Sequence, residues 1–196
     1  RPGGNITGWT HLAGLELNAK RLGILKEAVP GAARIGALWN PANPIHGPSL
    51  KEVEAAALRL KVQLHPMGVQ DPQKLQGAFS AMAQERVQAL TVPPDGMFLA
   101  HQALIIDLAA KHRIPTMYGV RELAEAGGLM AYGVNLPEMY RDGAFFVDKI
   151  LKGAKPADLP VEQPTKFELI INLRTAKALD LTIPQSLLNR ADQLIE

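Results

Sequence analysis

Apolar residues along the chain follow two patterns that take turns. Helical spacing of apolar residues predicts helices at 15–28, 50–60, 74–85, 98–112 and 139–151. Between them, short apolar or β-branched runs predict strands at 34–39, 63–69, 89–92, 115–118 and 129–134. Because helix and strand alternate with short links, we expect an α/β fold with a doubly wound parallel sheet covered by helices on both faces.

Turn-forming residues agree with these boundaries. Pro30-Gly31 ends the first helix, and Pro93-Pro94-Asp95-Gly96 ends the third strand in a tight turn. The segment 152–164 contains Gly153 and repeated prolines, which predicts a linker or an extended crossing segment. After it we predict a strand at 167–172, a short helix at 175–179 and a last helix at 184–195.

Composition excludes several classes of protein. The chain has 196 residues, of which 47% are hydrophobic and 20% charged, and its formal net charge is +2. Basic residues are spread among acidic ones, so nothing favours binding to nucleic acid, and no apolar stretch reaches the ~18 residues of a bilayer span. The absence of cysteine excludes disulfides and thiolate chemistry. The start at Arg1, without Met or signal peptide, predicts a segment cut from a longer protein.

Ligands of open parallel sheets bind beyond the carboxyl ends of the strands, which directs attention to three loops. These loops are expected at 40–46, 93–98 and 118–120. Asn40 and Asn43 carry amides that donate and accept hydrogen bonds, and Asp95 offers a carboxylate suited to an ammonium group. Trp9 and Tyr118 offer aromatic walls.

Each of these residues also has a structural interpretation. Asn40 and Asn43 lie beside prolines, where Asn commonly forms turns, and Asp95 precedes a glycine, as a helix N-cap does. Tyr118 and Tyr132 each precede a glycine, which permits a close ligand but also marks hinges and bulges. Both interpretations remain open from the sequence.

Catalytic and metal-binding signatures are weak. The five histidines form no HExxH or other close metal spacing, and neither a GxSxG elbow nor a P-loop occurs. His46, behind the Asn-rich loop, either lines the site or is an exposed loop residue. We therefore expect no catalytic residue, no metal and no cofactor.

Segments spread along the chain carry a family resemblance. They are RPGGNITG at 1–8, LKEAVPG at 25–31, LWNPANP at 38–44, AAKHRIP at 109–115, EAGGLM at 125–130 and DKILKGAKPADLPVE at 148–162. Together they resemble the substrate-binding proteins of ABC transporters, in particular those for tryptophan and other aromatic amino acids. Members of that kind carry Thr-Asp-Asn where this chain has Pro94-Asp95-Gly96, so Asp95 is retained and its neighbours differ.

The resemblance implies a type I periplasmic-binding-protein (Venus-flytrap) fold, with two lobes joined by three crossings and most of the first lobe missing from this chain. It places the first crossing at 1–11, the second lobe at 12–128, a crossing and a first-lobe helix at 129–162, and the third crossing with the end of the second lobe at 163–196. The residues that it implies for ligand binding are Trp9, Thr10, Asn40, Asn43, Asp95, Tyr118 and Tyr132.

The function that the resemblance implies is capture of a small, amino acid-like ligand in the periplasm or another extracytoplasmic space. The ligand then passes to the membrane permease of an ABC transporter, without nucleic-acid binding or membrane insertion. Two alternatives remain open: a ligand-sensing domain of a regulator, and an enzyme with His46 and Asp95 as acid and base. Without the first lobe, the apolar face of the helix near 139–151 is expected to repack on the second lobe, to form a dimer, or to meet a lobe outside this chain.

Overall fold

The computed structural model describes residues 3–10, 14 and 16–196. The chain divides into two compact units. The large unit comprises Leu15–Gly133 and Glu168–Glu196, and the small unit comprises Arg1–Gly14 and Val134–Phe167. The boundaries expected from the resemblance, after residues 11, 128 and 162, lie a few residues earlier in each case. Residues 12 and 15, the expected starts of the second lobe and of the first helix, lie outside the described residues.

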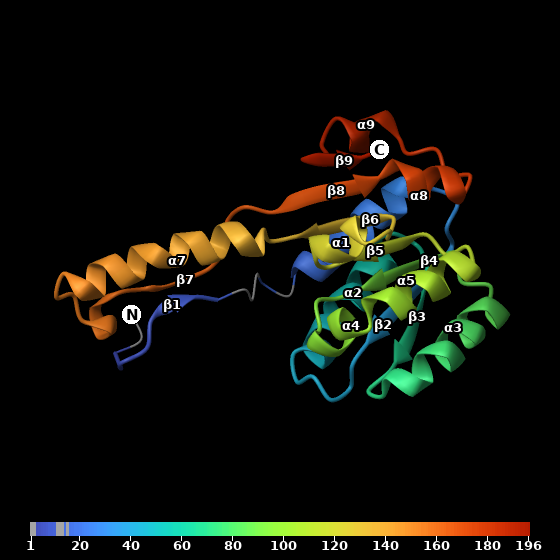
Figure 1. Cartoon of the computed structure of the whole chain (residues 1–196). Coiled ribbons are helices and arrows are strands. Elements are labelled where there is room, and N and C mark those ends of the chain that lie inside the picture. The colour runs from blue at the N-terminus through green and yellow to red at the C-terminus, as the bar shows by residue number, and fades with distance from the viewer. Residues whose placement is uncertain (1–2, 11–13, 15) are drawn as a thin grey trace. The chain divides into compact units, whose positions relative to one another are not determined.

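A seven-stranded sheet forms the centre of the large unit, in the order β3-β2-β4-β5-β6-β8-β9 (Figure 1). The strands are β2 (Arg34–Trp39), β3 (Gln63–Gly68), β4 (Ala89–Val92), β5 (Thr116–Tyr118), β6 (Met130–Gly133), β8 (Glu168–Asn172) and β9 (Gln193–Ile195). Strands β2 to β6 pair in parallel, as the alternating pattern predicts. The expected parallel sheet is thus present, and strand β8, which runs antiparallel to β6, is an addition that the alternating pattern does not predict.

The reversal at β8 has a simple geometric cause. Strand β6 ends at Gly133, where the chain passes into the small unit, and it returns at Glu168, which pairs with Gly133. A chain that leaves and re-enters a sheet at the same end must run in the opposite direction on its return.

Helices cover the sheet of the large unit on both faces. They are α1 (Glu16–Ala28), α2 (His46–Arg59), α3 (Leu75–Gln84), α4 (Gly96–Ala100), α5 (Gln102–Lys111), α6 (Arg121–Glu125), α8 (Leu173–Ala178) and α9 (Gln185–Leu188), with a 3-10 turn η1 at Pro72–Lys74. Strand residues such as Leu90 share one core cluster with Phe79 of α3 and Ile105 of α5. Neighbouring strand residues such as Ala89 are also buried but lie outside that cluster, because side chains alternate between the faces of a strand. Helix α1 packs against α2, β4 and β5.

Two of the expected helices differ from the structure. The helix expected at 98–112 is broken at His101, whose φ of −112° and ψ of 27° leave the helical region, so α4 and α5 are separate. The last helix, expected at 184–195, ends at Leu188, and Gln193–Ile195 pair with β8 instead. The outer edge of β8 offers backbone groups that need partners, and a local apolar pattern does not reveal such an edge.

The small unit is built around α7 (Leu136–Leu151), with β1 (Gly8–Trp9), β7 (Val161–Glu162) and a 3-10 turn η2 (Pro156–Asp158). Strands β1 and β7 pair in parallel. The rings of Trp9 and of Phe146 in α7 are nearly perpendicular, with 6.2 Å between their centroids. Asn135 caps α7 by accepting a hydrogen bond of 3.0 Å from the backbone N–H of Glu138.

One face of α7 carries exposed apolar side chains. Tyr140, Val147 and Leu151, at helical spacing, are 77%, 57% and 82% exposed. No helix in the described part of the chain has both the length and the apolar character needed to cross a membrane.

Candidate ligand-binding site

The sheet order brings two of the expected loops together. Strands β2 and β4 are parallel neighbours, so their carboxyl ends lie at the same edge. Asn40 follows β2 directly, and Asp95 lies between β4 and α4. The loop with Asn40 and Asn43 therefore meets the loop with Asp95, although they are more than fifty positions apart in sequence.

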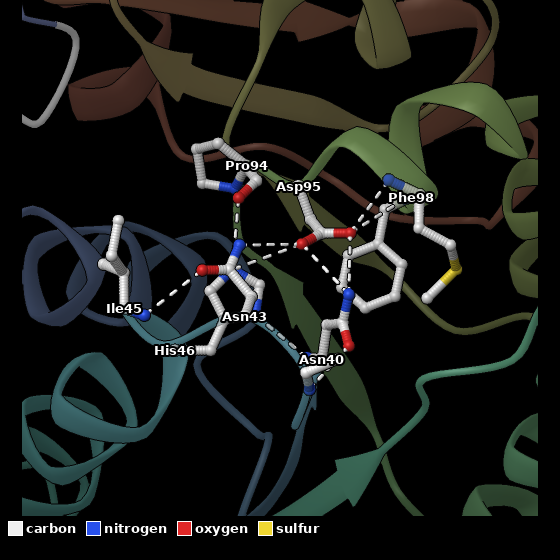
Figure 2. Close-up of polar contacts among 9 residues, drawn as sticks. Asn40, Asn43, Ile45, His46, Pro94, Asp95 and Phe98 are labelled. Atoms are coloured by element: carbon white, nitrogen blue, oxygen red, sulfur yellow. Dashed lines mark hydrogen bonds and ion pairs between the residues drawn. The ribbon is translucent and has the colours of Figure 1, made fainter.

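Asp95 is the centre of a hydrogen-bond network at this edge (Figure 2). Its Oδ2 accepts from Asn43 Nδ2 at 2.9 Å, and Asn40 Nδ2 lies 3.3 Å from both carboxylate oxygens. Its Oδ1 also accepts from the backbone N–H groups of Met97, at 3.0 Å, and Phe98, at 3.3 Å. Asp95 thus caps α4, since these N–H groups at the start of a helix have no intrahelical partner.

The same contacts show the structural roles of the two asparagines. The side-chain oxygen of Asn40 accepts from Ala42 N, and that of Asn43 accepts from Ile45 N, so each residue forms a turn. Their side-chain nitrogens donate to the carboxylate of Asp95, and the side chain of Asp95 is 4% exposed. The carboxylate accepts from four N–H groups, so a ligand ammonium would have to displace one of them.

His46 lies behind this network and is buried, so the expectation of an exposed loop residue is wrong. Its Nδ1 accepts from the backbone N–H of Asn40 at 2.9 Å, and its Nε2 lies 3.2 Å from the carbonyl oxygen of Pro94. These partners assign the proton to Nε2, which makes His46 a neutral donor to Pro94. The ring also stacks on Phe98. Both ring nitrogens contact the backbone of these loops, so His46 holds the two loops together.

Tyr118, expected at the ligand, lies in the core cluster and is 1% exposed. Burial raises the pKa of its hydroxyl above the usual value. A Cβ atom on Gly128 would lie 2.4 Å from its ring, so the ring fills the space that this glycine leaves. In this structure Tyr118 contributes to packing.

The glycines after Tyr118 and Tyr132 are required by close approach of the chain. A Cβ atom on Gly119 would lie 2.3 Å from the ring of Pro94, and one on Gly133 would lie 2.2 Å from the carbonyl oxygen of Gly119. The segments that leave β4, β5 and β6 therefore stack directly on one another at the carboxyl edge.

Arg21 of α1 joins this stack and was not among the expected site residues. Its Nε donates to the carbonyl oxygen of Tyr132 at 2.7 Å, and its Nη2 lies 3.3 Å from that of Gly119. The side chain is buried, and burial lowers its pKa to about 10. The sequence did contain a signal, because Arg21 interrupts the apolar face of a helix between Leu17 and Leu25.

Tyr132 is 7% exposed and lies at the end of β6. Lys20 of α1 stands over its ring, with Nζ 4.8 Å from the ring centroid. The aromatic face thus meets a cation at the same edge of the sheet.

Trp9 and Thr10, the other two expected residues, belong to the small unit. Thr10 donates its backbone N–H to the carbonyl oxygen of Glu162 at 2.9 Å. Trp9 lines a cavity of about 90 Å³, together with residues of α7 and of the segment 164–166. At this cavity Lys166 pairs with Glu138 at 3.1 Å, and that hydrogen bond raises the pKa of Lys166.

The structure thus brings only part of the expected set into direct contact. Among the seven expected residues, side-chain hydrogen bonds join Asn40, Asn43 and Asp95. Within the described residues, His, Asp and Glu side chains form no group that would hold a metal ion.

Comparison with known proteins gives a family and a fold. The model of a family described as ABC transporter substrate binding protein matches residues 1–195. A curated relative, the tyrosine-binding protein of Clostridioides difficile strain R20291, is 24% identical over 182 residues, which are 92% of this chain and 51% of the relative. The chain therefore spans about half the length of that relative.

Solved structures agree with the fold. A conserved domain protein from Vibrio cholerae matches with a TM-score of 0.87 at 24% identity, over 98% of this chain and 64% of that one. An ABC domain in complex with L-Trp from Streptococcus pneumonia matches with a TM-score of 0.85 at 25% identity, over 100% of this chain and 66% of that one. A LacI family transcriptional regulator from Bifidobacterium animalis subsp. lactis matches with a TM-score of 0.58 at 16% identity, over 78% of this chain and 59% of that one. These likenesses confirm the expected type I periplasmic-binding-protein fold.

Proposed function

This chain belongs to the family of ABC transporter substrate binding proteins, and from that premise we propose that it captures an amino acid outside the cytoplasm for delivery to a membrane permease. The names of two relatives support an aromatic amino acid, since one is a tyrosine-binding protein and one was solved with L-Trp. The chain spans 51% of the first and 66% of the second, so ligand, permease and location are proposals for the protein to which it belongs.

The observation that carries the proposal is the Asp95 network at the carboxyl edge of the sheet. It holds the loops after β2 and β4 together through the hydrogen bonds of Asp95 to Asn43 and to the N–H of Met97, and through that of His46 to Asn40. Loops held in this way lose little conformational freedom on binding, which favours affinity. We propose that they form one wall of the ligand site, with Asn40, Asn43 and Asp95 in it.

Capture then follows from a shift between open and closed states. A ligand that contacts both lobes of such a protein binds the closed state more tightly and so raises its population. Trp9, Thr10 and Tyr132 lie next to the segments where the chain passes between the two units, and we propose that they complete the site.

A second candidate function is a ligand-sensing domain of a regulator. The fold of the LacI family regulator supports it, but that likeness concerns the fold alone. A DNA-binding or signalling segment fused to the chain would favour sensing, and a neighbouring permease gene would favour transport. An enzyme with His46 and Asp95 as acid and base receives less support, since the contacts of both side chains are taken up inside the protein.

The proposal is tested by thermal denaturation of the protein to which this chain belongs, with amino acids, sugars and nucleotides. A ligand at one hundred times its Kd stabilises the native state by about 2.7 kcal/mol, so L-tryptophan or L-tyrosine should raise Tm. Calorimetry should then give a Kd for the hit. A rise in Tm with sugars or nucleotides, and none with any amino acid, would overturn the proposal.

A further inference from the structure

Arg21 is a buried cation without a carboxylate to neutralise it. Its side chain is 3% exposed, and none of the recorded ion pairs in the described residues includes it. The six residues outside the description contain no Asp or Glu, so the chain itself offers no further carboxylate there. Burial of a charge is costly unless an opposite charge or strong hydrogen bonds compensate for it.

The compensation present comes from neutral oxygens. Arg21 donates to the carbonyl oxygens of Tyr132 and Gly119 on its buried side and to Oδ1 of Asn18, at 2.6 Å, on its partly exposed side. A guanidinium carries five N–H groups in a planar fork that matches a carboxylate, and these three contacts leave part of the fork without a recorded acceptor. Asn18, which is half-buried, is thus the side chain whose neutral oxygen accepts from the guanidinium.

Arg21 contacts the edge of the sheet at which open α/β sheets bind their ligands. Gly119 and Tyr132 lie at the carboxyl ends of β5 and β6, the edge at which such sheets bind ligands. A second cation, Lys20, lies over the ring of Tyr132, and no ion pair of Lys20 is recorded in the described part of the chain. Two neighbouring cations without acidic partners favour an anion at this edge.

We propose that Arg21 binds the carboxylate group of the ligand, whose oxygens take the place of the Asn18 amide oxygen. The inference rests on the proposed capture of an amino acid and names the residue that recognises the acid group. From the sequence we expected Asp95 to recognise the ammonium group of the ligand. The inference instead assigns recognition of the ligand's carboxylate group to Arg21.

The test with the least risk to folding is Asn18→Asp, which offers Arg21 a carboxylate from the chain itself. This variant should have a higher Tm than the wild type and should bind L-tryptophan or L-tyrosine at least about tenfold more weakly, because its own carboxylate occupies the fork. Asn18→Ala is the matched control: it removes the neutral acceptor without adding a charge, and its affinity should equal or exceed that of the wild type.

A ligand series separates recognition from general structural support. The amines tryptamine and tyramine lack the carboxylate, so Asn18→Asp should not weaken their binding, and Arg21→Lys should weaken the amino acids at least about tenfold more than the amines. Equal loss for amino acids and amines, or unchanged amino-acid affinity in Asn18→Asp, would overturn the inference while the proposed function stands.

If the protein to which this chain belongs binds no amino acid, that result contradicts the proposed function, and the inference about Arg21 is then tested separately. In that case sodium acetate is titrated against ¹⁵N-labelled protein while the Nε–H signal of Arg21 is followed. A shift in the wild type that is absent in Asn18→Asp supports a carboxylate site at Arg21. A signal that stays unchanged in the wild type overturns it.

Discussion

The side-chain amide of Asn43 donates a hydrogen bond of 2.9 Å to Oδ2 of Asp95, so the loops after β2 and β4 share one carboxylate. The carboxylate also caps α4. A residue expected to meet a ligand directly is therefore first a residue that holds two loops in register. A change at Asp95 should therefore alter both the stability of the protein and its affinity for a ligand.

Replacing Asp95 should cost both stability and binding. Asp95→Ala removes the cap of α4 and the acceptor for two amides, so the free energy of unfolding should fall by about 2 kcal/mol. Affinity for the amino-acid ligand should fall at least about tenfold, because the loops lose their fixed positions. Urea denaturation and calorimetry measure the two effects.

Asp71→Ala is the control for the Asp95 variant. Asp71 caps the turn η1 by accepting a hydrogen bond from Gln73 N, and among the described residues it joins no second loop, so its removal should cost about 1 kcal/mol and leave affinity unchanged. An Asp95→Ala protein with unaltered affinity would remove Asp95 from the ligand site.

His46 should be found as the neutral tautomer with its proton on Nε2. Its Nδ1 accepts the N–H of Asn40, so a proton cannot occupy Nδ1 without breaking that bond. Long-range ¹H–¹⁵N spectra near neutral pH distinguish the two nitrogens, and His101, whose ring has no recorded hydrogen bond in the described part of the chain, serves as the comparison. A protonated Nδ1 in His46 at neutral pH would contradict the assignment.

The glycine at the end of β6 should tolerate no side chain. Gly133→Ala brings a Cβ atom to 2.2 Å from the backbone oxygen of Gly119, which cannot move without disturbing β5, so we expect a loss of about 3 kcal/mol or failure to fold. Gly23→Ala is the matched control, because nothing lies within 4 Å of its added methyl group in α1. That variant should gain about 0.5–1 kcal/mol, and thermal denaturation of both proteins tests the contrast.

The exposed face of α7 should promote association of the isolated chain. Tyr140, Val147 and Leu151 form an apolar stripe that water solvates poorly, so the dimer expected from the sequence remains a prediction for this chain. Changing all three to Ser should lower the sedimentation-average mass at high protein concentration. Leu58→Ser is the control, since Leu58 on α2 is 80% exposed but isolated; a chain that is monomeric throughout, with no change on substitution, contradicts the prediction.

The local pattern of apolar and turn-forming residues was sufficient to predict most of the helices and strands and some of the contacts at the candidate site. Strands β2 and β4 were expected at their observed bounds, because apolar runs and the turns that end them are properties of short segments. The loop expected at 93–98 is three residues shorter, since α4 begins at Gly96. The same local information correctly offered the turn and cap roles of Asn40, Asn43 and Asp95. It gave no means to choose between those roles and ligand contact, because the choice depends on which donors meet the carboxylate.

The sequence by itself determined the α/β class, the places of strands β2 to β6 along the chain and the residues that follow their carboxyl ends. Only the tertiary structure decided that β8 runs antiparallel to β6, that 193–195 form a strand, and that Tyr118 enters the core. It also decided that Asp95 receives the amides of Asn40 and Asn43, while Arg21 remains without a carboxylate. Element type follows from neighbours in sequence, whereas strand direction, burial and charge pairing depend on segments far apart in the chain.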